Sequence, residues 1–438
     1  MNNLIFNYEN TCGLSKFDLV RDSEKLSSVL NKINDAASSN DYDSVFSSIN
    51  LPFDRKTFLK VNKLAGKYKN VSCVVIVGIG GSNLGTMAVQ EAVLGKFHNL
   101  ISSDKPKVLY ADTIDSDSMN KIIQIIESEL RNKKMVLINC VTKSGSTTET
   151  IVNFSILLEL LKKYVKKYKE YIVITTDKDS VLYNLAVKEK YNVLEVPKNV
   201  GGRYSVLSPV GLFPLAVLGI NIEKLLEGSR VMRNFCISKD ILKNPAAVSA
   251  LVLYTHYKRN RNIHNTFLFA NDLEALGKWY RQLMGESIGK EKDVSGRTVK
   301  VGITPTVAIG STDLHSMAQL YLGGPEDKVT TFVSIKHFNE TIKVPENELS
   351  NLVPSIVNKE LDFTMQAIVE GVKKSYENRG LPFMEIVLPN KSAYYLGQLL
   401  QFKMIEMIYL GHLLNVNPFD QPNVEEYKEE TKNILEAK

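Results

Sequence analysis

Apolar and polar positions along the chain alternate between short β-branched runs and longer segments with helical spacing. From residue 71 the short runs are "CVVIVGIGG", "KVLYADT", "MVLINCVTKSG", "YIVITTD" and "YNVLEVP". A second series contains "NTFLFAND", "TPTVAIGST", "DKVTTFVSI" and "FMEIVLP". Strands that alternate with helices form parallel sheets with helices on both faces. The pattern therefore predicts two α/β units in tandem.

The segments outside these two series set the expected domain boundaries. Residues 1–65 mix polar helix-like stretches such as "SEKLSSVLNKIN" with Ser/Asn/Asp-rich breaks, and they contain no run typical of a buried strand. We expect a helical arm there, a first α/β domain at residues 66–230 and a second at 231–400. Residues 401–438, which begin inside the apolar run "SAYYLGQLLQFKMIEMIYLGHLLN", are expected to form a C-terminal helix and tail that complete the site.

Composition and charge exclude several classes of function. The chain has 438 residues, a formal net charge of +6 and 44% hydrophobic residues, which is an ordinary globular balance. The basic run "LLKKYVKKYK" is typical of a solvated helix face, so we expect no nucleic-acid partner. The chain shows neither a signal-peptide pattern nor an apolar run of membrane-spanning length, which predicts a cytoplasmic protein without a membrane partner. Four scattered cysteines without a CxxC pair indicate neither zinc nor a disulfide framework.

The loop in "VVIVGIGGSNLG" raises the question of which phosphate it receives. A dinucleotide fingerprint needs a third glycine where this chain has Asn83, and the nearest acid at a strand end, Asp112, comes several residues late for a ribose contact. A Walker A loop needs a lysine, which this loop lacks. What remains is a strand, a turn and a helix start in which Ser82 and backbone amides face an anion, although glycines also serve tight strand–helix packing.

A second loop, "INCVTKSGSTTET", favours phosphate binding over packing alone. It follows a predicted strand, precedes a predicted helix and offers a series of hydroxyl groups. Hydroxyls and free helix-start amides together suit a phosphate dianion. An N-cap accounts for one or two of these hydroxyls and leaves the others without a structural reason.

Six motifs, taken in order, resemble those of the glucose-6-phosphate isomerase (phosphoglucose isomerase) family. They are "GIGGSNLG", "TKSGSTTET", "VGGRYSVLSPVG", "GESIGK", "STDLHSMAQLYLGGP" and "FDQPNVEEYK", and they extend from about residue 74 to 428. The resemblance implies two tandem SIS-type (flavodoxin-like) parallel-sheet α/β/α sandwich domains. It also implies reversible isomerisation of glucose 6-phosphate to fructose 6-phosphate, a step of glycolysis and gluconeogenesis, by ring opening and proton transfer through a cis-enediol. In the family a histidine reaches the site from the partner subunit, which implies a homodimer with a shared site.

The same resemblance assigns roles to residues by their positions in the motifs. Glu286 would be the base, Arg203 would face the substrate near C1 and C2, and His315 and Lys428 would handle opening of the sugar ring. The residues expected to bind the substrate are Gly81, Ser82, Thr142, Lys143 through its backbone amide, Ser144, Thr147, Gln282 and Gln421.

These residue types match what the chemistry needs. A carboxylate can remove the proton next to a carbonyl and return it to the neighbouring carbon, as Glu286 would. A fixed cation such as Arg203 stabilises the negative enediolate, and a histidine such as His315 can move a proton near neutral pH. Histidines and carboxylates show no metal-ligand spacing, and an enediol route needs no metal. We therefore expect neither a metal nor a cofactor.

Two departures from the family pattern and two alternatives remain. Ile288 stands where the family commonly has asparagine, and "NVEEYK" replaces a glycine-containing form, so the fit around C1 and C2 can differ. One alternative is a related isomerase acting on mannose 6-phosphate or an amino sugar phosphate, against which the set of Arg203, Glu286, His315 and Lys428 argues. The other is a non-enzymatic SIS-type sensor, which could dispense with Glu286.

Overall fold

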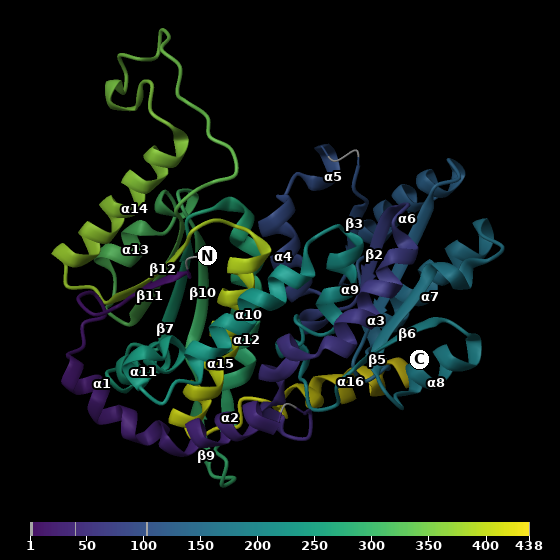
Figure 1. Ribbon diagram of the computed structural model, residues 1–438, viewed down its shortest axis with the longest axis horizontal. Helices are drawn as coiled ribbons and strands as arrows, with labels where there is room; N and C mark the ends of the chain where they lie inside the picture. The colour runs from purple at the N-terminus through teal and green to yellow at the C-terminus, as the bar shows by residue number, and fades with distance from the viewer. Residues whose placement is uncertain (1–2, 40, 102–103, 438) are drawn as a thin grey trace. The chain divides into compact units, whose positions relative to one another are not determined.

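The computed structural model describes residues 3–39, 41–101 and 104–437. The chain forms two compact units (Figure 1). The first unit is Ile33–Arg230, and the second unit is Met1–Lys32 together with Val231–Lys438. Two helices, α2 (Ser27–Ser39) and α10 (Ile222–Cys236), run across the divisions between them.

The first unit is built on a parallel sheet whose central strands are buried on both faces. Cys73 and the four residues after it are fully buried, which is why this run is continuously apolar rather than alternating. Its strands, in the spatial order β3-β2-β4-β5-β6, are β2 (Val71–Val77), β3 (Lys107–Ala111), β4 (Met135–Val141), β5 (Ile172–Asp177) and β6 (Asn192–Val196).

Helices cover both faces of this sheet. Apolar residues of α6, α7 and α8 pack on the side chains of Cys73, Val75 and Val77 and form one continuous core. Helix α9 contacts β2 as well as α3 and α4. The helices of the first unit are α3 (Arg55–Ala65), α4 (Leu84–Leu94), α5 (His98–Ile101), α6 (Ser116–Arg131), α7 (Thr148–Tyr164), α8 (Val181–Glu189) and α9 (Pro209–Val217).

The second unit also contains a five-stranded sheet, in the order β1-β12-β11-β7-β10. Four of its strands are parallel and β1 pairs antiparallel with β12. Its strands are β1 (Ile5–Asn7), β7 (Ile263–Leu268), β10 (Thr304–Ile309), β11 (Lys328–Ile335) and β12 (Phe383–Leu388), and a separate hairpin joins β8 (Lys290–Lys292) to β9 (Thr298–Val301).

Helices of the second unit lie on opposite faces of its sheet. Phe267 and Phe332 pack against Val369 and Tyr376 of α14, whereas His264, on the other face of β7, contacts the ring of Tyr280 on α12. Helix α12 in turn contacts α15, which contacts α11. The helices are α1 (Lys16–Ser23), α11 (Pro245–Lys258), α12 (Glu274–Ile288), α13 (Ala318–Gly323), α14 (Leu361–Asn378), α15 (Ala393–Leu413) and α16 (Val424–Glu436).

The parallel strands of the two sheets follow the same order. In the first unit the chain goes from β2 to β3 on one side and then to β4 on the other, and in the second unit it goes from β7 to β10 and then to β11 in the same way. The strand order therefore reverses between β2 and β4 and between β7 and β11. Ligand sites of open α/β sheets lie at such reversals, at the carboxyl ends of the strands.

The nine strands predicted from the sequence are all confirmed, but the terminal segments differ from the expectation. Residues 1–65 are not one helical arm, because the chain passes from the second unit to the first after Lys32 and carries the short strand β1. The boundary expected at residue 401 falls inside α15, which is buried along its length and belongs to the core of the second unit. Three-residue strands such as β1 and β8 leave too short a pattern to predict.

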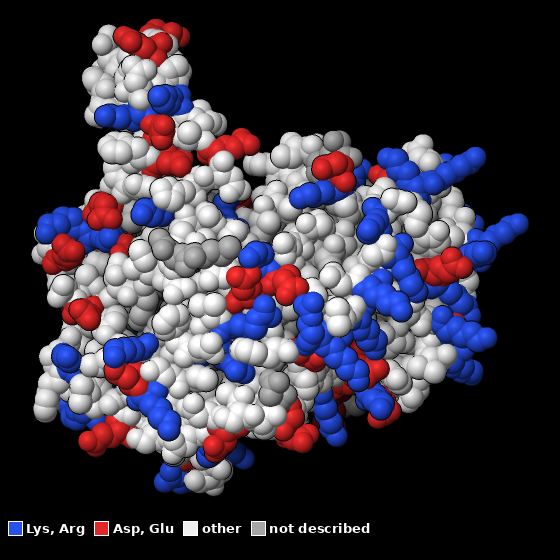
Figure 2. Space-filling view, in the orientation of Figure 1, with Lys and Arg blue, Asp and Glu red and all other residues white. Residues whose placement is uncertain are grey.

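Surface charge is mixed, and the basic run that begins at the end of α7 contains lysines paired with glutamates. Lys162 lies 2.6 Å from Glu159, and Lys169 lies 2.9 Å from Glu189. On the face drawn in Figure 2, Lys and Arg are interspersed with Asp and Glu. In the part of the chain that the structure describes, we find no helix combining the length and hydropathy needed to cross a bilayer.

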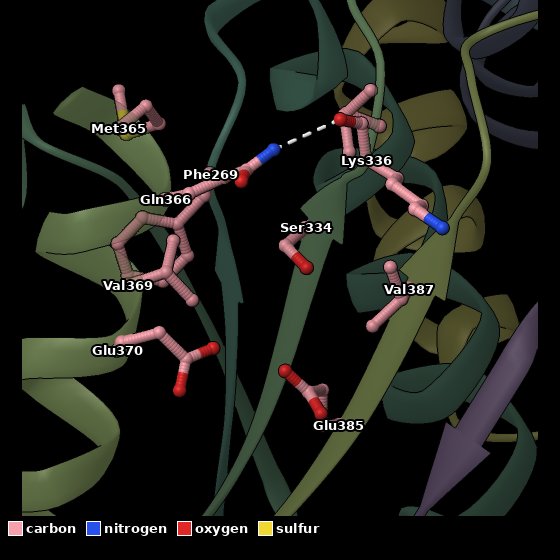
Figure 3. Close-up of a pocket in the computed structure, with 10 residues that line it drawn as sticks. Phe269, Ser334, Lys336, Met365, Gln366, Val369, Glu370, Glu385 and Val387 are labelled. Atoms are coloured by element: carbon pink, nitrogen blue, oxygen red, sulfur yellow. Dashed lines mark hydrogen bonds between the residues drawn. The ribbon is translucent and has the colours of Figure 1, made fainter. Parts of the chain in front are cut away.

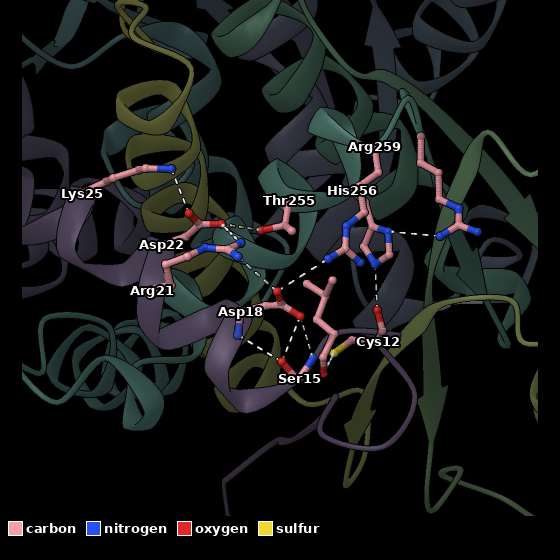
Figure 4. A network of polar contacts seen from close by, with 11 residues as sticks. Cys12, Ser15, Asp18, Arg21, Asp22, Lys25, Thr255, His256 and Arg259 are labelled. Atoms are coloured by element: carbon pink, nitrogen blue, oxygen red, sulfur yellow. Dashed lines mark hydrogen bonds and ion pairs between the residues drawn. The ribbon is translucent and has the colours of Figure 1, made fainter.

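The N-terminal segment is held to α11 by polar contacts (Figure 4). Ser15 caps α1 through a capping box with Asp18, and Asp18 also lies 3.6 Å from Arg259. His256 on α11 is fully buried, with its Nε2 2.7 Å from the Cys12 carbonyl oxygen. Burial lowers the pKa of His256 to about 4, because the charged imidazolium would lose its hydration.

This buried histidine predicts a loss of stability in acid. The unfolded chain binds a proton near pH 6.5 and the folded chain only near pH 4, so His256 lowers the free energy of unfolding as the pH falls through that window. The loss attributable to it, once the pH is below both pKa values, is on the order of 3 kcal/mol. Chemical denaturation at several pH values should show a shallower acid dependence for His256→Gln, which cannot ionise. An equal slope in both proteins would contradict the assignment.

Candidate functional site

The glycine loop and the hydroxyl loop lie side by side at the strand reversal of the first unit. Val77 at the end of β2 pairs with Cys140 of β4, so the loops that follow these strands leave the same edge of the sheet. A Cβ built on Gly78 would lie 2.9 Å from the Val141 carbonyl oxygen and 2.9 Å from the Ser82 Cβ. A side chain at position 78 would clash with both atoms, so glycine at this position allows the Ser82 side chain to lie close to the end of β4.

The hydroxyl loop presents donors that are not used up by helix capping. Thr147 occupies the N-cap of α7, but its side chain makes no capping hydrogen bond. Instead its hydroxyl lies 2.9 Å from the hydroxyl of Thr142, which is buried. Ser144 is exposed, and its hydroxyl accepts a hydrogen bond from the Ser146 amide at 3.3 Å. The first amides of α7 thus face the loop without a side-chain cap, which suits an anion.

The segment that carries Arg203 packs directly on the glycine loop. A Cβ on Gly81 would lie 2.3 Å from the Gly202 carbonyl carbon and 2.5 Å from the Arg203 amide nitrogen. Arg203 lies in a short 3₁₀ helix, Gly202–Tyr204, and is 3% exposed. Hence the fold of the first unit brings Gly81, Ser82 and the backbone of Arg203 together at one end of the sheet.

Lys143, within the hydroxyl loop, connects this loop to the end of β5 and to Lys198. The Lys143 carbonyl oxygen accepts hydrogen bonds from the Asp177 amide and from the Thr176 hydroxyl, both at 3.3 Å. The Lys143 ammonium donates to the Lys198 carbonyl oxygen at 2.6 Å. Burial lowers the pKa of Lys143 and raises the pKa of Asp177 to about 6. The Lys143 side chain therefore fixes the loop, which leaves its backbone amide for a ligand.

Asn83 also has a structural partner. The Asn83 side chain donates to Asp112 at 3.0 Å, and its Oδ1 is buried without a hydrogen-bond partner. Asp112, the acid at the end of β3, thus holds the residue that replaces the third glycine of a dinucleotide loop. This contact gives Asp112 a use other than the ribose contact of a dinucleotide site.

Glu286 lies in the last turn of α12, in the second unit. Its Oε1 accepts a hydrogen bond from Gln282 Nε2 at 3.2 Å, one helical turn earlier, and both side chains are partly buried. The Gln282 Oε1 is buried without a hydrogen-bond partner. Two residues predicted from separate roles therefore form one contact pair on a single helix face.

Helix α12 is anchored by a buried polar cluster. The Tyr280 hydroxyl donates to Glu406 Oε2 at 2.7 Å, and the Lys403 ammonium donates to Glu406 Oε1 at 2.9 Å. The Ser249 hydroxyl also donates to Glu406 Oε1. Loss of these partners would leave a buried, unpaired carboxylate and would strongly destabilise the fold. The cluster therefore fixes α12 against α11 and α15.

The remaining predicted residues of the second unit are exposed. His315 follows the 3₁₀ helix Thr312–Leu314 and precedes α13, so it lies in the short connection between them. Gln421 lies just before α16. Lys428 lies on α16 and pairs with Glu425 at 2.6 Å, as a residue on a solvated helix face does. The fold of the second unit by itself does not bring His315 and Lys428 into one contact.

Sequence reasoning missed Lys290, which contacts both segments of the predicted site. Its ammonium donates to the Glu286 carbonyl oxygen and to the Asp420 carbonyl oxygen, each at 2.6 Å. Lys290 is the last letter of "GESIGK", four residues after Glu286. The only signal in the sequence was the spacing of four residues, which puts Lys290 one helical turn after Glu286. A lysine at the end of a helix is usually exposed, so its burial could not be predicted.

The cavity in Figure 3 is separate from these residues. It has a volume of about 170 Å³ and lies between α14 and the strands β11 and β12, with Ser334, Gln366 and Glu385 among its lining residues. None of the predicted site residues lines it. A second cavity of about 180 Å³, between α13 and α14, is lined mainly by apolar side chains.

Metal-binding side chains are dispersed. Among the described residues there is no group of three or more His, Cys, Asp or Glu side chains that could hold a metal ion. All four cysteines are buried free thiols. Burial raises the pKa of Cys73 to about 12, and such a thiol is a poor nucleophile near neutral pH.

The sequence was compared with protein-family models and with curated proteins, and both comparisons identify the same family. A family model described as phosphoglucose isomerase matches residues 59–438. A glucose-6-phosphate isomerase from Carboxydothermus hydrogenoformans is 37% identical over 374 residues, which cover 82% of this chain and 78% of that protein.

Solved structures show the same fold. A hypothetical protein from Thermus thermophilus superposes with a TM-score of 0.86 at 29% identity, covering 99% of each chain. A glucose-6-phosphate isomerase from Chlamydia trachomatis gives a TM-score of 0.77 at 20% identity, covering 91% of this chain and 76% of the other. The expected fold class, tandem SIS-type α/β/α domains, is confirmed.

The packing at Gly81 gives a testable asymmetry. Gly81→Ala places a methyl group 2.3 Å from backbone and forces the loops apart, whereas Gly202→Ala meets its nearest atom, the Gly81 Cα, at 3.7 Å. We expect Gly81→Ala to weaken binding of glucose 6-phosphate by about tenfold or more and to destabilise the fold by about 1–3 kcal/mol. Calorimetric titration and thermal unfolding of both variants measure this. Equal behaviour of the two alanines would contradict the packing argument.

Proposed function

The chain belongs to the phosphoglucose isomerase family, and we propose that its two groups of site residues together carry the reversible isomerisation of glucose 6-phosphate and fructose 6-phosphate in glycolysis and gluconeogenesis. The observation that carries this proposal is the convergence of three loops on the strand reversal of the first unit. These loops present uncapped helix amides and the paired hydroxyls of Thr142 and Thr147. They form a donor-rich receptor for a single phosphate group.

The phosphate would be held by Ser82, Thr142, Ser144 and Thr147, with the Lys143 amide beside them. Apart from the Lys143 ammonium, which is engaged with Lys198, these groups are neutral. A neutral receptor binds a dianion through oriented dipoles and leaves the nearby arginine for the reacting carbons. Gly81 supports this role by bringing the glycine loop against the backbone of Arg203.

Glu286 would take the proton from C2 of the aldose and return it to C1. The hydrogen bond from Gln282 to Oε1 orients the Glu286 carboxylate, which would act as the base toward the substrate carbon. As the proton leaves, negative charge develops on the two oxygens of the enediolate. Arg203 stabilises that charge because its guanidinium stays protonated throughout.

His315 and Lys428 would assist ring opening by moving a proton between the ring oxygen and the C1 hydroxyl. Imidazole suits this transfer near neutral pH. Gln421, which the Lys290 contact with Asp420 holds near the end of α12, would line the pocket around the reacting carbons.

A homodimer with a shared site accounts for the exposure of His315. The segment between β11 and α14 projects from the second unit (Figure 1) and carries exposed apolar side chains: Ile342 is 64% exposed, Leu349 60% and Leu352 77%. A patch of this kind is typical of a surface that a partner covers. We assign the partner as a second copy of this chain and the location as the cytoplasm.

The reaction is tested by supplying fructose 6-phosphate and following glucose 6-phosphate with a coupled assay, in buffer with and without a chelator. We expect turnover that the chelator does not change. Mannose 6-phosphate and an amino sugar phosphate, tested in parallel, distinguish the related isomerases. Binding without turnover of any of these sugars would favour a sensor instead.

The base is tested by Glu286→Gln, which keeps the size of the side chain and removes its basicity. We expect kcat to fall by about three orders of magnitude or more while glucose 6-phosphate still binds, because the phosphate contacts lie elsewhere. Glu274→Gln, at the other end of the same helix, is the matched control and should keep its activity. Near-normal turnover by Glu286→Gln would remove this residue from the role.

The shared site is tested by mixing two inactive chains, His315→Ala and Glu286→Gln. In a heterodimer one site combines the intact glutamate of one chain with the intact histidine of the other, so about half of the wild-type activity should return per heterodimer. Size-exclusion chromatography with differently tagged chains verifies that heterodimers form. Verified heterodimers without activity would show that each chain supplies its own histidine.

A further inference from the structure

The carbonyl end of α12 is closed by a lysine side chain. A helix leaves its last four carbonyl groups without partners inside the helix. The Gly289 amide donates to the Gly285 carbonyl oxygen at 3.0 Å, and the Lys290 ammonium donates to the next carbonyl oxygen, that of Glu286, at 2.6 Å. The ammonium thus both caps the helix and places a positive charge at the negative end of the helix dipole.

The same ammonium also holds the segment that precedes α16. It donates to the Asp420 carbonyl oxygen at 2.6 Å and lies 3.3 Å from Asp420 Oδ1. The Asp420 carboxylate is oriented by Asn417, whose side-chain amide donates to Oδ2 at 2.8 Å. Since Asp420 directly precedes Gln421, one nitrogen atom links the backbone at Glu286 to the backbone at Gln421.

Burial makes this link specific. Lys290 is 6% exposed, whereas its strand neighbours Glu291 and Lys292 are exposed. An ammonium has three donors, and removing it from water is favourable only where acceptors replace that water. Two backbone carbonyls and one carboxylate oxygen provide such acceptors here.

The hairpin that begins at Lys290 makes further contacts with the C-terminal segment. The Asn423 side-chain amide donates to Glu291 Oε2 at 3.0 Å, and the Val294 amide donates to the Asn415 carbonyl oxygen at 3.0 Å. The hairpin therefore serves as a platform for the segment between α15 and α16. Lys290 is the point at which this platform reaches the helix of Glu286.

We propose that Lys290 is a positioning residue of the reaction, which sets the separation between the base Glu286 and the pocket residue Gln421. This inference rests on the proposed function. Lys290 acts through the backbones of these two segments rather than on the sugar. Reaction rates depend steeply on such separations, because a misplacement of about 1 Å can lower a rate about a hundredfold.

The test compares kcat and KM for fructose 6-phosphate in three variants. Lys290→Met keeps the length of the side chain and removes its donors; we expect kcat to fall about 10- to 100-fold and KM to change less than about threefold, because the phosphate loops are in the other unit. Lys292→Met, an exposed lysine of the same strand, should stay within about twofold of wild type. Asp420→Asn retains both carbonyl acceptors and should stay within about threefold.

A double-mutant cycle separates positioning from general damage. If Lys290 acts through the Gln421 segment, Lys290→Met combined with Gln421→Ala should lower kcat no further than the more severe single change. If Lys290→Met does not fold, Lys290→Gln, which keeps an N–H donor, should fold with an intermediate kcat. Wild-type kcat in either Lys290 variant, or effects that multiply in the cycle, would overturn the proposal. Absence of turnover by the wild type would reject the reaction itself and this role with it.

Discussion

Close backbone packing at the carboxyl ends of β2 and β4 is the constraint on which the proposed phosphate site depends. Gly78 lies against the end of β4 and Gly81 against the backbone of Arg203, at distances where a methyl group would clash. Because neither has a side chain, three loops from distant parts of the sequence share one small volume. Hydroxyls and helix-start amides that would otherwise point at separate patches of solvent converge there, and their dipoles add.

Charge is handled differently in the two units. In the first unit the charged residues nearest the hydroxyl loop, Lys143 and Asp177, are partly buried and brace its backbone, so a ligand meets mainly neutral donors. In the second unit ionic groups are used to fix helices: the buried Lys403 and Glu406 anchor the middle of α12, and Lys290 fixes its end. Rigidity of this kind is expected where a carboxylate must meet a particular carbon atom.

The sequence was sufficient for the features that recur over several residues. Nine strands were predicted because short apolar runs rich in β-branched residues differ clearly from the longer amphipathic helices, and the glycine and hydroxyl loops followed from their places after such runs. The burial of single polar residues could not be predicted from the sequence. Lys290 and Asp177 are of residue types that are usually exposed, and their burial and their contacts depend on the three-dimensional path of the chain. Short pieces such as β1 were missed because pairing with β12, and not local pattern, makes them strands.

The shared strand order of the two sheets has a consequence for how the reaction is divided. Helix α4 follows the first parallel strand of one sheet, β2, and α12 follows the first parallel strand of the other, β7, so the two helices are topological counterparts. The α4 helix begins beside the glycine loop without a side-chain cap, and Glu286 lies in the last turn of α12, at its carboxyl end. Under the proposed function, phosphate anchoring and proton transfer would therefore fall to opposite poles of one repeated architectural unit.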